Sequence, residues 1–97
     1  MKAVTLALPT LEELRRYVRA VLYAPDWLEP GRTPLYQGLV TRRDRPCGLF
    51  FQVQGPRQLK TYALWAGKEG RILFYDSQGQ RFAQTRLSEG PSTRELA

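Results

Sequence analysis

The first regular pattern of apolar residues lies near the start of the chain and has helical spacing. Thr10 and Glu13 form a capping-box pattern immediately before it, and Pro25 follows it as a stop signal. The pattern predicts an amphipathic helix over residues 10–24 as the first element of the fold. The apolar positions that share one face of this helix are Leu11, Leu14, Val18, Val21 and Leu22.

From Pro34 onward the pattern changes to short runs rich in aromatic and β-branched residues, with Gly or Pro turn signals between them. This pattern is typical of an antiparallel meander. We expect strands at residues 35–43, 47–54, 59–66, 71–76 and 81–87, and turns at 44–46, 55–57, 67–70 and 77–80. The apolar alternation ends after residue 87, so residues 88–97 are predicted to be a mobile tail.

The predicted fold class is therefore α+β, as a single domain over residues 1–87. An N-terminal amphipathic helix packs on one face of a curled antiparallel meander of four to five strands. This element order is similar to the helix and meander of cystatin-like proteins and, more loosely, to Sm-like small barrels. No sequence motif of either family is present, so the similarity implies no function.

Alternation within the predicted strands separates two faces of the sheet. Leu49, Phe51 and Val53 point to one side, and Phe50 points to the other with Gln52. The helix can cover only one side, so large apolar side chains remain on the second. They either form ordinary half-exposed strands, or are covered by barrel closure or self-association. The candidate protein-interaction face consists of Phe50, Tyr62, Leu64 and Tyr75.

Charge adds a second candidate site. The 97 residues include 15 Lys and Arg against 9 Asp and Glu, a net charge of +6 that favours an acidic partner. Successive meander turns alternate between the two ends of a sheet, so the first and third turns share an end. Basic side chains there either contact phosphates or simply keep the strands from pairing with other chains. The candidate phosphate-contacting residues are Arg42, Arg43, Arg45, Lys68 and Arg71.

Composition also argues against several classes of function. The chain has no histidine and one cysteine, Cys47, so it offers no Ser-His or Cys-His nucleophile pair, no internal disulfide and no Cys-based zinc site. We expect no enzymatic activity, no metal and no cofactor. The apolar start of the chain ends at Pro9 and acidic residues follow, which argues against a signal peptide. We expect a cytoplasmic protein that does not enter a membrane.

Two functions remain from the sequence. The first is a protein-interaction or self-associating module, including a homodimer, that uses the exposed sheet face. The alternative is a basic nucleic-acid-binding domain that contacts phosphates through the arginine-rich hairpin end and stacks bases on exposed aromatic rings.

Overall fold

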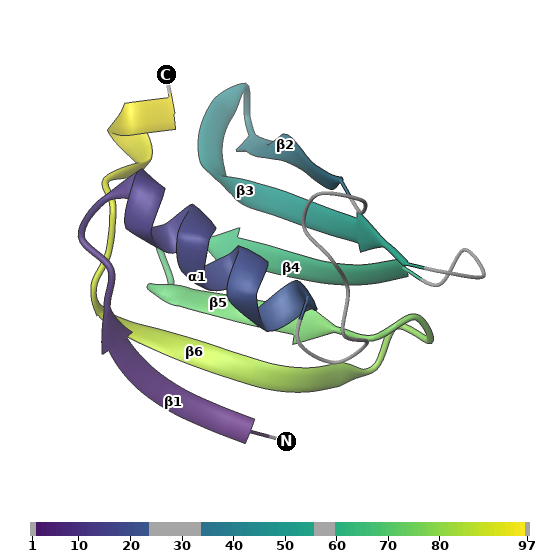
Figure 1. The fold of residues 1–97 in the computed structure, drawn as a ribbon. Helices are drawn as coiled ribbons and strands as arrows, with labels where there is room; N and C mark the ends of the chain where they lie inside the picture. The colour runs from purple at the N-terminus through teal and green to yellow at the C-terminus, as the bar shows by residue number, and fades with distance from the viewer. Residues whose placement is uncertain (1, 24–33, 56–59, 97) are drawn as a thin grey trace.

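The computed structural model describes residues 2–23, 34–55 and 60–96, and it places them in a six-stranded mixed sheet with one α-helix packed on it (Figure 1). The class is α+β. The elements in chain order are β1 (Lys2–Ala7), α1 (Leu11–Tyr23), β2 (Leu35–Arg42), β3 (Arg45–Gln54), β4 (Lys60–Ala66), β5 (Arg71–Tyr75), β6 (Arg81–Glu89) and a 3-10 helix (Thr93–Leu96).

The helix is not the first element, which corrects the sequence prediction. β1 precedes it and pairs in parallel with β6, with Val4 beside Thr85 and Leu6 beside Leu87. The strand order is β1-β6-β5-β4-β3-β2, so the sheet has six strands rather than four to five, and one of its pairs is parallel. Residues 2–7 form a strand because they pair with β6, which is distant in the sequence. No local pattern of residues could therefore predict this strand.

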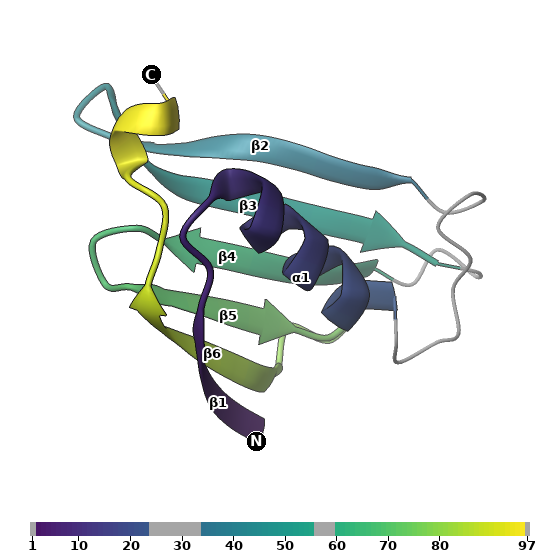
Figure 2. The same cartoon turned by 60° about the vertical axis from the view of Figure 1, so that its left-hand side comes forward.

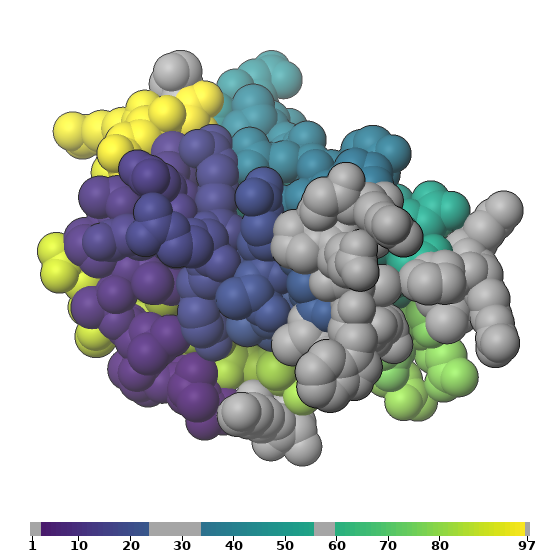
Figure 3. Space-filling model, viewed as in Figure 1, coloured from purple at the N-terminus to yellow at the C-terminus, as the bar shows by residue number. Residues whose placement is uncertain are grey.

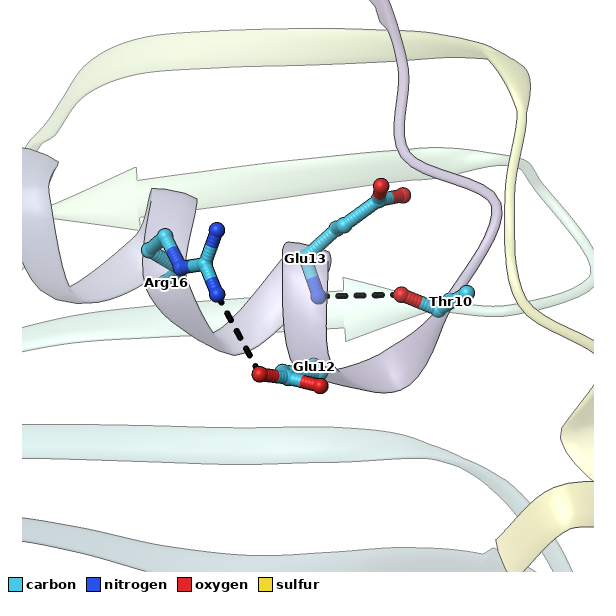
Figure 4. Close-up of polar contacts among 4 residues, drawn as sticks. All are labelled: Thr10, Glu12, Glu13 and Arg16. Carbon is cyan, nitrogen blue, oxygen red and sulfur yellow. Dashed lines mark hydrogen bonds and ion pairs between the residues drawn. The ribbon is translucent and has the colours of Figure 1, made fainter.

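α1 begins at the N-terminal cap that the sequence predicts. The backbone N–H of Glu13 donates a hydrogen bond to Thr10 Oγ1 at 3.1 Å, which satisfies one of the free donors at the helix start (Figure 4). One turn later Arg16 and Glu12 form an exposed ion pair at 3.2 Å (Figure 4). The predicted last helical residue, Ala24, lies outside the described residues.

The core lies between α1 and one face of the sheet. Leu14, Val18 and Leu22 are fully buried on the helix, and Phe51 and Trp65 are their largest buried partners on the sheet. Figure 3 looks onto this side and shows α1 and β1 covering much of the molecule's surface. Burial of this apolar area is the main source of stability in so small a domain. The remaining buried members of the core are Tyr23, Leu49, Val53, Ala63, Ile72, Phe74 and Leu87.

The turn between β2 and β3 differs from the prediction. Arg43 and Asp44 both have positive φ, 54° and 64°, and form a two-residue hairpin turn, so β3 already begins at Arg45. The sequence prediction placed the turn at residues 44–46 because Pro46 is a turn signal. Pro46 instead lies within β3 beside a register shift, where a ladder donor is not required.

The C-terminal region continues beyond the predicted domain boundary at residue 87. β6 runs to Glu89, Pro91 is buried, and Leu96 of the 3-10 helix packs against the core. The mobility of residues 88–97 stays a prediction. Among the described residues, no helix is both long enough and apolar enough to cross a membrane.

Candidate functional site

The face of the sheet opposite α1, called the open face below, follows from the strand register. Phe50 is paired with Leu64, and Leu64 with Leu73, in one row across β3, β4 and β5. The neighbouring row contains Tyr36, Gln52, Tyr62 and Tyr75. All four residues of the predicted interaction face, Phe50, Tyr62, Leu64 and Tyr75, therefore occupy the open face.

Phe50 and Tyr62 form the centre of this face. Their rings lie 5.7 Å apart between centroids at an interplanar angle of 37°, and 37% of Phe50 is exposed. Leu73, in the row that contains Phe50, is only 5% exposed although it does not belong to the main core cluster. The open face therefore has a small apolar centre of its own, with aromatic rings at its surface.

Tyr75 differs from the other predicted residues because Arg81 covers it. The Arg81 guanidinium carbon lies 5.6 Å from the centroid of the Tyr75 ring, and Arg81 Nη2 donates a hydrogen bond to the Tyr75 hydroxyl at 3.3 Å. This cation–π arrangement leaves Tyr75 less available as a stacking surface than Phe50 or Tyr62.

Tyr36 belongs to the open face, and the sequence analysis missed it. It lies in the edge strand β2, in the same row as Tyr62, and 55% of it is exposed. Alternation within residues 35–43 carries the signal that could have identified it, since Tyr36 and Gly38 share a side opposite to Leu35 and Gln37.

Cations surround the open face, and the described strands contain a single carboxylate, Glu89, which lies beside Ala7 at the end of β6. Arg71 and Arg86 are directly opposite each other on β5 and β6. Arg71 forms an ion pair with Glu69 at 2.6 Å, while its Nε is buried and has no hydrogen-bond partner in the described part of the chain. Lys60 and Arg81 lie toward the other end of the face. Adjacent like charges are unfavourable unless an anion lies between them.

A cleft of about 1160 Å³ lies at the end of the sheet where the β2–β3 turn, the β4–β5 turn and the 3-10 helix meet. Figure 2 shows these three segments at one end. Four of the five predicted phosphate-contacting residues line the cleft, namely Arg42, Arg43, Arg45 and Lys68. Arg71, the fifth, is not among its lining residues and lies on the open face instead. Arg94 of the 3-10 helix also lines the cleft, and the sequence analysis missed it because it assigned Arg94 to a mobile tail.

The cleft and the open face are continuous. Val40, Leu64 and Ala66 line the cleft, and the register places all three on the open face. Leu64 is also the residue opposite Phe50. The arginine-rich end therefore opens directly beside the exposed aromatic rings.

The described residues contain no group of three or more His, Cys, Asp or Glu side chains that could hold a metal ion. Cys47 is a free thiol whose Sγ lies 3.4 Å from the Val40 carbonyl oxygen.

No protein family, curated protein or solved structure matches this chain.

Proposed function

We propose that this protein is a small non-enzymatic binding module whose open face and cleft together bind single-stranded nucleic acid. The observation that carries the proposal is the continuity of the two surfaces through Leu64, which lines the cleft and packs beside Phe50. A single strand presents bases on one side and phosphates on the other. It therefore needs aromatic rings and cations within one continuous surface.

The exposed rings supply the base contacts. Tyr36 on β2 is 55% exposed and Phe50 on β3 is 37% exposed, and Tyr62 contacts Phe50 from the next strand, β4. Stacking of a base on an aromatic side chain contributes about 1–3 kcal/mol and discriminates little between bases. Binding with little sequence preference is the expected behaviour.

The charge on the open face supports a polyanion rather than a second copy of this chain. Two copies joined through this face would bring Arg81 and Arg86 of one toward the same residues of the other, and Glu89, at the end of β6, is the single carboxylate among the described strand positions. Uncompensated like charges at an interface oppose association.

A protein-interaction module, the first expectation from the sequence, remains the second candidate. The half-exposed Leu64 and the Phe50–Tyr62 pair favour it, because apolar and aromatic side chains are also the anchors of protein interfaces. By the same charge argument, such a partner would present an acidic surface.

The test compares two exposed apolar residues on opposite sides of one strand. Tyr36→Ala removes a ring from the open face, and Leu39→Ala, 54% exposed, removes a side chain from the helix side of β2. Fluorescence anisotropy with a labelled oligothymidine of about 12 nucleotides, a length within the usual site sizes, measures both. We expect Tyr36→Ala to weaken binding by about fivefold or more and Leu39→Ala to leave it unchanged.

Salt dependence gives a second readout. If about three phosphates are contacted, log K falls with log salt with a slope of about −2 for a single strand. Wild-type protein that binds neither single-stranded nor duplex oligonucleotides at low salt would refute the proposal. Light scattering on the same samples would then show whether the chain self-associates, and loss of the dimer in Phe50→Ser or Tyr62→Ser would support the second candidate.

A further inference from the structure

We infer that the cleft at the turn end binds a phosphomonoester, the terminal phosphate of the strand that lies on the open face, with the indole N–H of Trp65 as a buried donor. The inference rests on the proposed function and adds to it a polarity and a defined end for the bound strand. It follows from an unsatisfied donor, an excess of cations and the position of the cleft.

The unsatisfied donor is Nε1 of Trp65. Trp65 is 1% exposed, and its Nε1 is buried without a hydrogen-bond partner in the part of the chain that the structure describes. Its ring atom Cζ2, two bonds from Nε1, lies 3.5 Å from the position that a Cβ on Gly67 would occupy, and both residues line the cleft. A buried N–H without an acceptor is unfavourable, and an anion oxygen in the cleft would satisfy it once a small movement of the cleft wall uncovers the N–H, which is shielded from solvent in this structure.

The cations exceed what one backbone phosphate requires. Five basic side chains line the cleft against one carboxylate, Glu69, which is already paired with Arg71. A phosphodiester carries a single negative charge, whereas a phosphomonoester carries about −1.5 to −2 near pH 7 and offers three acceptor oxygens. The cluster therefore matches a terminal phosphate better than an internal one. The basic residues are Arg42, Arg43, Arg45, Lys68 and Arg94.

The cleft is also where a bound strand would end. It begins at Leu64 on the open face and continues past the strand ends to the 3-10 helix, where Thr93 Cγ2 lies against Gly67. That contact joins the helix to the β4–β5 turn at the far side of the cleft. A chain of nucleotides that crosses the open face toward this side meets the cleft with its last phosphate.

The experiment uses oligothymidines that differ only at their ends, with a 5′-phosphate, a 3′-phosphate or hydroxyls at both ends. The chain's other tryptophan, Trp27, is replaced in a Trp27→Phe background, so that emission reports on Trp65 alone. We expect one of the two phosphorylated ends to bind about tenfold more tightly than the hydroxyl strand, as for a charge-assisted contact, and to change the Trp65 emission. Binding of thymidine monophosphate and of inorganic phosphate is measured in parallel, to distinguish recognition of a free phosphate from recognition of a strand end.

Variants test whether the preference for a phosphorylated end arises in the cleft. Arg43→Asn with Lys68→Gln removes two cleft charges, and asparagine tolerates the positive φ of residue 43. Arg16→Gln with Arg19→Gln on α1 is the control with the same change in net charge. We expect the cleft pair alone to abolish the preference for a phosphorylated end. Trp65→Phe should reduce the preference, and circular dichroism checks that this variant is folded.

The outcomes separate the inference from the function it rests on. Equal binding of hydroxyl and phosphorylated strands overturns the inference and leaves the proposed function standing. Binding of thymidine monophosphate without binding of any strand would support a phosphate cleft and refute the strand-binding function. A preference that survives in the Arg43→Asn, Lys68→Gln protein would overturn the assignment to this cleft.

Discussion

The two faces of the sheet are built from the same strands, yet their side chains differ in burial. In β4, Ala63 and Trp65 are 0% and 1% exposed beneath α1, while their neighbours Tyr62 and Leu64 on the open face are half-buried. The side chains are of the same chemical kind on both faces. The difference comes from α1, which covers a single face, so side chains of similar chemistry are buried on one side of β4 and partly accessible on the other.

The basic side chains on the two sides of the sheet also differ in their partners. Cations near the helix side find partners within the protein, as Arg16 does with Glu12 and Arg15 with the Gln37 side chain at 2.9 Å. On the open face Arg71 and Arg86 are opposite each other, and Arg71 Nε has no partner within the described residues. Glu69 pairs with Arg71, whereas Arg86 forms no ion pair within the described residues, so the open face combines exposed rings with at least one cation that has no carboxylate partner there.

The largest expected effect separates Phe51 from Phe50, adjacent residues on opposite faces. Phe51 is 0% exposed, so Phe51→Ala should lower the free energy of unfolding by about 3–5 kcal/mol. Phe50→Ala should lower it by about 1 kcal/mol or less, because 37% of the ring is already in water. Urea unfolding measures both. Equal losses would mean that the open face carries as much of the stability as the core.

A smaller loss of stability is expected from a substitution at Gly48, and a matched glycine, Gly38, shows whether packing is equally tight elsewhere on the open face. A Cβ on Gly48 would lie 1.9 Å from the Trp65 carbonyl oxygen, so Gly48→Ala must push β3 away from β4 and should lower the free energy of unfolding by about 1–3 kcal/mol. Gly38, its matched control in β2, has open space around the Cβ position. Gly38→Ala should leave the thermal unfolding midpoint unchanged or raise it, and a comparable loss in both variants would contradict the close approach at Gly48.

Removal of one positive charge from the open face should raise the free energy of unfolding and also weaken oligonucleotide binding. Arg86→Gln relieves the repulsion with Arg71 and should raise the free energy of unfolding by about 0.2–1 kcal/mol. The same variant should bind the oligothymidine less tightly and with a smaller salt slope. Arg19→Gln on α1 is the control of equal charge. A stability loss in Arg86→Gln would show that this arginine is satisfied within the protein.

The smallest effect concerns Tyr23 at the end of α1. Burial raises the pKa of its hydroxyl above the ordinary 10.0, and the positive charge of Arg19 partly opposes the rise. The folded state therefore holds this proton more tightly than the unfolded state. The resulting stability is complete below the unfolded pKa and is lost as the pH rises through the folded one.

Unfolding measured from pH 9 to 12 should accordingly show a decline above about pH 10 that is shallower in Tyr23→Phe than in the wild type. Tyr36→Phe, which removes an exposed hydroxyl from the open face, is the control. A decline of the same steepness with and without the Tyr23 hydroxyl would contradict its assignment to the buried face.

Local patterns were enough to place most elements. The helix was predicted over residues 10–24 and observed at Leu11–Tyr23, because the Thr10 cap and the apolar spacing act within one or two turns. β2 to β6 begin or end within about two residues of their predicted bounds, apart from residue 59, which lies outside the described residues. Both patterns are local, with periods of 3.6 and 2 residues.

The candidate site could be predicted only in part. Alternation placed Phe50, Tyr62, Leu64 and Tyr75 on one face, and the structure has all four there. It could not show that Arg81 covers Tyr75, since that contact depends on a bulge between β5 and β6. It also could not place Arg94 in the cleft, because the 3-10 helix is positioned by long-range packing of Leu96 against the core.

Short-range patterns predict the class of the fold and the faces of its strands, because both depend on residues close together along the chain, and composition alone shows the excess of positive charge. Only the tertiary structure decided that residues 2–7 form a strand, because their partner, β6, lies some 80 residues away. It also decided that the basic turns meet the aromatic face through Leu64. Hydrophobic patterning specifies which side of an element is buried, whereas strand order and the meeting of distant turns depend on how all the elements pack together.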